Sequence, residues 1–149
     1  MRAAVQRVAH ARVTVDNQVT GEIGRGLLVY VGVAGDDSTE DVAYLVDKIS
    51  NLRIFNDDQG KMNLSVRDIG GGVLVISAFT LQADARKGRR PSFDAAAPPE
   101  LANALYEQLC ESLGATGLTV ARGVFRAAME VESVNVGPIC VPLDSKRLF

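Results

Sequence analysis

Residues 73–76 read Val-Leu-Val-Ile directly after three glycines, and this run constrains the fold more than any other stretch of the chain. Four consecutive apolar residues, mostly β-branched and entered through a glycine turn, are typical of a strand buried on both faces. Ser77 and Thr80 follow at its far end, where ligands collect in sheets that helices flank. Hydroxyls at a strand end more often cap a turn than catalyse a reaction, so these two alone do not define a site.

The rest of the chain predicts a mixed sheet. A second continuous apolar run, at residues 27–33, predicts another central strand. Residues 52–55 are expected to form a further strand before a surface turn. Segments in which apolar and polar residues alternate predict the remaining strands, at residues 3–8, 11–15, 19–23, 118–124, 129–134 and 139–143.

Two helices are predicted to cover the sheet. The first begins near Ser38, a favourable N-cap, and its apolar residues recur at the spacing i, i+3, i+4, i+7. The second begins at Pro98-Pro99 and carries leucines every four residues, with Ala104 in the same stripe and Gly114 as its end. Without a linker or repeat, these elements predict one α/β domain over residues 1–149.

Composition limits the cellular compartment of the protein and the kinds of ligand site that it can carry. No apolar run reaches the roughly 18 residues that a membrane span needs, and the N-terminus lacks the apolar core of a signal peptide. A cytoplasmic protein with no membrane partner is therefore expected. Cys110 and Cys140 lack metal-type spacing and His10 has no visible partner, so no metal site and no cofactor are expected. The formal net charge of −2 argues against broad nucleic-acid binding. One dense basic stretch stands apart, formed by Arg86, Lys87, Arg89 and Arg90.

A second motif supports a functional role for the strand end at residues 77–81. Residues 133–139 read Ser-Val-Asn-Val-Gly-Pro-Ile, and residues 77–81 read Ser-Ala-Phe-Thr-Leu. Together they resemble the D-aminoacyl-tRNA deacylase family, whose signatures are a Ser-Gln-Phe-Thr-Leu strand end and an Asn-x-Gly-Pro turn near the C-terminus. The likeness extends over nearly the whole chain, with further matches in the same order at residues 1–3, 6–8, 51–55, 61–65 and 86–93.

The resemblance implies a fold and an activity. Members of this family have a three-layer α/β/β arrangement and work as homodimers with the active site at the subunit interface. They hydrolyse the ester that joins a D-amino acid to the terminal ribose of tRNA, can accept glycyl-tRNA, and leave L-aminoacyl-tRNA intact. The chain is therefore expected to act on tRNA that carries a D-amino acid or glycine, and not to bind DNA.

The resemblance also assigns catalytic roles. The backbone N–H groups of Ala78 and Phe79, beside Ser77, would bind the substrate carbonyl or its oxyanion. The Thr80 hydroxyl would orient the reacting group, and the ribose 2′-hydroxyl of the tRNA would assist. Thr80 as a covalent nucleophile is a lower-ranked alternative, because the sequence offers no base to activate it.

The remaining assignments concern chirality and the tRNA end. Gly137-Pro138, cis in the family and braced by Arg7, would enter the partner's site and reject L side chains through its backbone carbonyls. Phe125 and Met129 would line the pocket for the terminal adenine, although both could equally be core residues. The phosphate contacts would come from Arg86, Lys87, Arg89 and Arg90, although such a charge run is usually a solvated surface.

Three positions depart from the family pattern. Ala78 stands where the family has glutamine, Cys140 replaces a usual threonine, and Arg126 replaces a usual glycine. Three alternatives therefore remain open: a non-catalytic tRNA-binding module, a general small-ester hydrolase, and a β-rich dimeric scaffold whose motifs only pack and turn. The joint presence of both signatures favours the deacylase.

Overall fold

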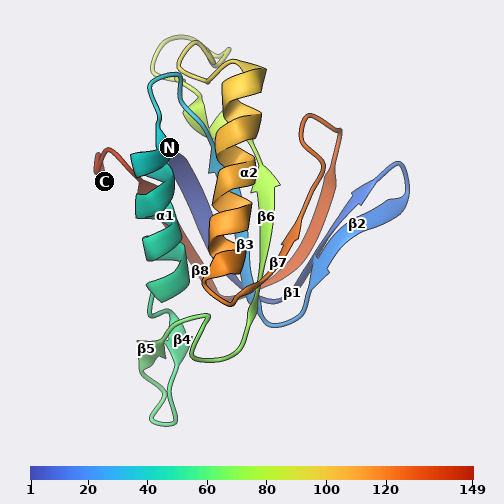
Figure 1. Cartoon of the computed structure of the whole chain (residues 1–149), viewed down its shortest axis with the longest axis vertical. Coiled ribbons are helices and arrows are strands. Elements are labelled where there is room, and N and C mark those ends of the chain that lie inside the picture. The colour runs from blue at the N-terminus through green and yellow to red at the C-terminus, as the bar shows by residue number, and fades with distance from the viewer.

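The two continuous apolar runs form neighbouring parallel strands in the middle of one sheet (Figure 1). The computed structural model describes all of residues 1–149, and in it β3 (Gly26–Gly32) pairs in parallel with β6 (Gly72–Ser77). The other edge of β6 pairs in parallel with β7 (Thr119–Arg122). Residues 73–76 are at most 2% exposed, which confirms the predicted strand buried on both faces.

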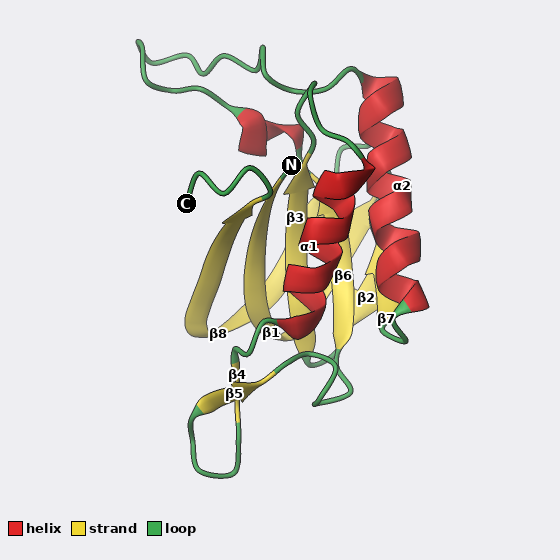
Figure 2. Ribbon diagram, turned by 60° about the vertical axis from the view of Figure 1, so that its left-hand side comes forward, coloured by secondary structure: helices red, strands yellow, loops and turns green.

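The long strand β1 (Arg2–Val15) extends the sheet with antiparallel partners. Its first part pairs with β3, and its last part pairs with β2 (Gln18–Ile23). The strand β8 (Glu130–Asp144) runs along its other edge. Figure 2 shows the resulting sheet as strongly curved, with both helices on one side of it.

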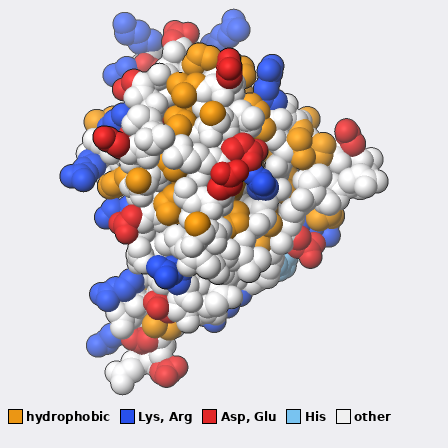
Figure 3. Space-filling model, viewed as in Figure 1, with side chains coloured by type: hydrophobic (Ala, Val, Ile, Leu, Met, Phe, Trp, Pro, Cys, Tyr) orange, Lys and Arg blue, Asp and Glu red, His pale blue; other side chains and the backbone are white.

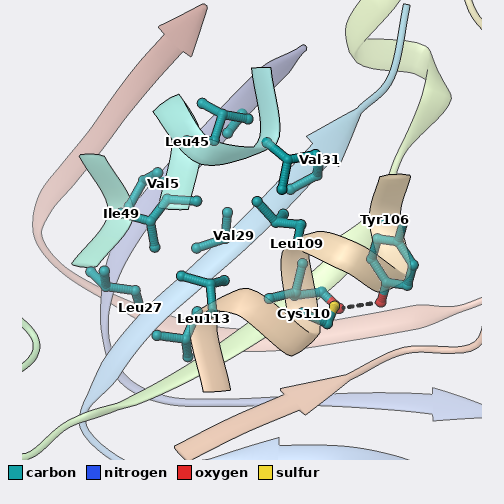
Figure 4. Packing of buried hydrophobic residues seen from close by; sticks show 14 of the residues in the cluster. Val5, Leu27, Val29, Val31, Leu45, Ile49, Tyr106, Leu109, Cys110 and Leu113 are labelled. Atoms are coloured by element: carbon teal, nitrogen blue, oxygen red, sulfur yellow. Dashed lines mark hydrogen bonds between the residues drawn. The ribbon is translucent and has the colours of Figure 1, made fainter. Parts of the chain in front are cut away.

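Successive residues of the central strands alternate between two apolar cores. Val29 and Val31 face α1 (Thr39–Asn51) and α2 (Pro99–Ala115), whose leucines pack over them in Figure 4. Leu28 belongs to a second core on the other face, formed with Val8, Ala11, Val13, Ile23, Leu74 and Ile76. Helices, central strands and the curved-over parts of β1 and β2 give the predicted α/β class with its three layers.

The start of α1 lies where the sequence predicts it. The Ser38 side chain accepts a first-turn N–H, and the Asp41 carboxylate accepts the N–H of Ser38 at 2.8 Å, which forms a capping box. Asp41 also accepts a hydrogen bond from Ser145 at 2.6 Å, and the Met1 ammonium donates to Asp37 and Ser145. These bonds tie the beginning of β1, the beginning of α1 and the end of β8 together.

The buried face of α2 differs from the predicted stripe. Ala104 is exposed, and the helix continues past Gly114 to Ala115. In a helix of 3.6 residues per turn, positions four apart drift by roughly 40° per step, so a line of leucines turns away and its neighbours complete the face. The buried residues are Ala102, Leu105, Tyr106, Leu109, Cys110 and Leu113. No helix of the fold is long and apolar enough to cross a membrane.

Residues 52–55 do not form the predicted strand over their whole length. Only their last residue belongs to a strand, β4 (Phe55–Asn56), which pairs with β5 (Met62–Leu64) in a separate two-stranded hairpin. The Ile54 carbonyl accepts a hydrogen bond from Arg7 Nη1 at 2.7 Å. An arginine side chain of β1 thus contacts the backbone just before β4.

The two strands predicted at residues 129–134 and 139–143 are parts of one strand, β8. Asn135 pairs with Val8 and Cys140 pairs with Gln6, so residues 136–139 stand opposite a single residue of β1. The Gly-Pro segment is therefore a bulge within one strand, and the prediction of two separate strands on either side of it is wrong. A bulge bends its strand and projects the extra residues away from the ladder.

Candidate active site

A cavity of about 680 Å³ opens beside the ends of β3 and β6. It is mostly apolar, because 12 of its 16 lining residues are hydrophobic. Its position fits the general rule that ligands bind where central parallel strands end. It brings together six residues assigned to the site from sequence: Ser77, Ala78, Phe79, Thr80, Phe125 and Met129.

The turn after β6 is held tightly against the end of β3. The Ala78 N–H donates to the Val31 carbonyl at 2.8 Å, and the buried Gln82 side chain donates to the Gly32 carbonyl at 2.7 Å. A Cβ at Gly32 would lie 2.8 Å from the Ala78 carbonyl oxygen and 2.9 Å from Leu81 Cβ. This close approach of two backbone segments requires a glycine.

The Ala78 N–H is therefore not free to bind substrate, which corrects one of the two oxyanion donors expected from the sequence. Its hydrogen is donated to the Val31 carbonyl, one residue past the end of β6. Phe79 begins the 3-10 helix η1 (Phe79–Gln82), and the first N–H groups of a helix have no acceptor within that helix. Phe79 N–H is the better candidate donor toward the cavity.

Thr80 lies at the cavity with an exposed side chain and no side-chain base beside it. No carboxylate, imidazole or amine lines the cavity. A hydroxyl that lacks an adjacent base is not activated for nucleophilic attack. The lining thus favours an orienting role for Thr80 over a covalent one, and that role stays a prediction.

Phe79 lines the cavity, and its ring packs against a second exposed ring that is not part of the lining. Phe79 is 57% exposed and meets Phe93 edge to face, with ring centroids 5.1 Å apart and an interplanar angle of 70°. Exposed aromatic surface next to a cavity is typical of a region that contacts a ligand or another protein surface.

Tyr30 is a cavity residue that the sequence analysis missed. It lies on β3 opposite Ile76 and lines the cavity, where burial raises the pKa of its phenol. The hydroxyl is therefore a neutral group that can donate one hydrogen bond and accept others. The available signal was a single hydroxyl inside the apolar run at residues 27–33.

Phe125 and Met129 line the cavity and also pack on the two cores. Phe125 contacts the helix-side core, where its ring centroid lies 6.1 Å from that of Tyr106. Met129 packs against the second core. The two roles weighed from the sequence, core packing and adenine contact, are therefore compatible, and the adenine contact stays a prediction.

Gly137-Pro138 lies outside the cavity of its own chain. Its peptide bond is cis, and both residues are exposed on the β8 bulge. Arg7 Nε donates to the Val136 carbonyl at 3.1 Å, and Asn135 Nδ2 donates to the Ile139 carbonyl at 3.2 Å. Arg7 thus contacts the bulge directly, while the Gly-Pro dipeptide and the cavity remain apart.

The basic loop joins η1 to α2, and blue side chains gather over it along the top of Figure 3. Within the loop, Arg86 forms an ion pair with Asp84 at 2.6 Å, and Asp84 bridges to Ser92. This pairing offsets the charge of Arg86. The other three cations of the loop, Lys87, Arg89 and Arg90, are exposed, and their contact with phosphates stays a prediction.

Comparisons with known proteins cover almost the entire chain. The family described as D-Tyr-tRNA(Tyr) deacylase matches residues 4–144. Proteins named D-aminoacyl-tRNA deacylase from Anaeromyxobacter dehalogenans and Syntrophobacter fumaroxidans are 61% and 57% identical over 149 residues, which is 100% of each chain. A solved structure described as c-Myc DNA Unwinding Element Binding Protein has a TM-score of 0.91 and 39% identity, and the match covers 97% of this chain and 98% of that one.

Proposed function

The chain belongs to the D-Tyr-tRNA(Tyr) deacylase family, and from that premise we propose that its cavity hydrolyses both D-aminoacyl-tRNA and glycyl-tRNA while sparing L-aminoacyl-tRNA. As a D-aminoacyl-tRNA deacylase it is an ester hydrolase that acts on tRNA. The observation that carries the proposal is a Ser-Ala-Phe-Thr strand end in an apolar cavity without a side-chain base. The products are the free amino acid and tRNA.

The reaction requires few catalytic side chains. An aminoacyl ester is already activated, so the site needs to position water and stabilise the oxyanion. In this proposal the Phe79 N–H donates to the oxyanion, the Thr80 hydroxyl orients the reacting group, and the ribose 2′-hydroxyl assists. The apolar lining strengthens these bonds because it lowers the local dielectric.

Replacing Thr80 with Ala separates the orienting role from the nucleophilic one. Loss of one oriented group costs on the order of 10²-fold in kcat, so Thr80→Ala should keep measurable activity. Thr80→Ser, which keeps the hydroxyl, is the matched control. Complete loss together with a trapped acyl-enzyme in the parent protein would instead identify Thr80 as the nucleophile.

The chiral filter in this proposal comes from a second subunit. Gly137-Pro138 is exposed and lies outside its own cavity, so it can reach a cavity only on a partner. There its backbone carbonyls would face the α-carbon of the substrate and clash with an L side chain. Exposed apolar residues that such a homodimer could cover include Phe79, Phe93, Val134 and Val136.

Amino acid release from matched D-, L- and glycyl-tRNA tests the activity. We expect rapid loss of the D and glycyl esters and a spared L ester. Binding of tRNA without turnover of any ester would leave a tRNA-binding module, and equal hydrolysis of D and L model esters without tRNA would leave a general esterase. Since one similar structure is described as a DNA-binding protein, single-stranded DNA of matched length is the control competitor, and it should not inhibit.

Mixed dimers test whether the filter acts across subunits. A Pro138→Ala protomer should gain L-ester hydrolysis, and an Ala78→Trp protomer should be inactive because the indole fills the cavity. When the Ala78→Trp protomer is added, its intact Gly137-Pro138 bulge should enter the cavity of the Pro138→Ala protomer. L-ester hydrolysis at that cavity should then be suppressed. A protomer carrying both changes is the control. Unsuppressed L-ester hydrolysis in confirmed mixed dimers would place the filter within one chain.

A further inference from the structure

Arg126 is the only charged residue that lines the cavity. Its side chain is exposed and forms no ion pair with the protein. Every acidic residue lies elsewhere, so the cavity carries one uncompensated positive charge. A lone cation at the edge of an apolar cavity concentrates field there and favours an anionic ligand group.

The backbone holds Arg126 in a conformation that favours glycine. Its φ is 65°, and the N–H of Ala127 donates to the Val124 carbonyl at 3.2 Å, which closes a turn with Phe125 and Arg126 at its centre. Arginine has none of the short side-chain hydrogen bonding that lets asparagine tolerate this region. Strain of this kind is typically retained where the side chain has a function.

We propose that Arg126 binds the phosphate that precedes the terminal adenosine of tRNA. The inference rests on the proposed function, which places the tRNA end in this cavity. Phe125, its neighbour in the same turn, lies where the adenine is proposed to pack, so the guanidinium stands at the nucleotide end of the ester. The α-ammonium of the amino acid would be repelled by Arg126, whereas a phosphate can accept two parallel hydrogen bonds from its planar fork.

Substrates with and without that phosphate test the contact. Arg126→Gln should raise KM for D-aminoacyl-tRNA about tenfold at low salt and leave kcat unchanged, because a remote contact binds ground and transition states equally. The slope of log kcat/KM against log salt should become shallower by about 0.7, the value for one single-strand phosphate contact. D-aminoacyl-adenosine, which lacks the phosphate, should be hydrolysed equally by both proteins.

Three variants exclude a merely structural effect. Arg126→Lys keeps the charge but not the planar fork, so it should keep the salt dependence of the parent protein and only part of its affinity for tRNA. Arg126→Gly relieves the left-handed backbone, so it should weaken tRNA binding while unfolding at the same or a higher temperature. Arg53→Gln removes another exposed arginine, just before β4 and away from the cavity, and should leave KM for both substrates unchanged.

The outcomes that overturn the proposal are specific. An equal rise in KM for D-aminoacyl-adenosine, or no change for either substrate, would show that Arg126 does not contact the phosphate. Titration calorimetry with adenosine 5′-phosphate and with adenosine measures the affinity for each ligand without any hydrolysis. The parent protein should prefer the phosphate form about tenfold, and Arg126→Gln should lose that preference. Equal affinities in the parent protein refute the inference, whereas absent hydrolysis of every ester refutes the proposed function alone.

Discussion

Adding one methyl group at Gly32 should displace the turn that carries Phe79 without changing any lining residue of the cavity. A Cβ there would lie 2.8 Å from the Ala78 carbonyl oxygen, while ordinary contacts begin near 3.4 Å, so the turn must move by about 0.6 Å. The shift also strains the 2.7 Å hydrogen bond from Gln82 to the Gly32 carbonyl. Overpacking of this kind costs about 1–3 kcal/mol of stability.

The larger effect of Gly32→Ala should be on the rate. Because a misplacement of about 1 Å can cost about 10²-fold, a shift of about 0.6 Å in the Phe79 N–H should lower kcat on D-aminoacyl-tRNA by at least about tenfold. Single-turnover hydrolysis measures kcat, and urea unfolding measures stability. Gly35→Ala is the matched control, since a Cβ there meets nothing within 4 Å. Full kcat in a destabilised Gly32→Ala protein would refute the reasoning.

Three further predictions concern acid stability, thiol reactivity and the substitution in the signature. Burial acts to raise the pKa of Asp41, but hydrogen bonds, that from Ser145 foremost, lower it on balance. The resulting stability is complete above about pH 4 and is lost as the pH falls further, so the free energy of unfolding should drop in acid less steeply for Asp41→Asn than for the parent. Burial raises the pKa of Cys110 to about 11, so a thiol reagent at about pH 8 should label only the exposed Cys140 until the protein is unfolded; rapid labelling of both would contradict this. Ala78→Gln should change kcat by less than about tenfold if backbone donors dominate, and a gain of several orders of magnitude would show that they do not.

The central strands and the start of α1 could be predicted because their signals are local. A glycine turn followed by continuous β-branched residues specifies a strand buried on both faces wherever the partners come from. Ser38, a favourable N-cap directly before an amphipathic pattern, specifies the start of α1 in the same way. The error at Ala104 has a different origin, since a stripe of leucines defines its own line but not which side of that line meets the sheet.

The details of the cavity could not be predicted because they depend on pairings between distant segments. Whether the Ala78 N–H is free is decided by the Val31 carbonyl on another strand. That Tyr30 reaches the cavity follows from its register opposite Ile76, since a slip of one residue would turn it to the other face. The bulge at residues 136–139 likewise exists only relative to β1.

The residues that the family likeness assigns to one site lie at two places on this chain, and in the proposed homodimer this separation would let hydrolysis and chiral choice be measured apart. The cavity holds every group assigned to ester cleavage, whereas Gly137-Pro138 projects from β8 outside it. If the filter acts across the proposed homodimer, an isolated subunit should still cleave the D ester but also attack the L ester, because nothing in its own cavity supplies the clash. Dilution of the protein should lower the ratio of the D-ester rate to the L-ester rate before it lowers the D-ester rate itself. A charged substitution at the exposed Val136 should have the same effect. A constant ratio in a preparation that sedimentation shows to be monomeric would mean that each chain makes its own chiral choice.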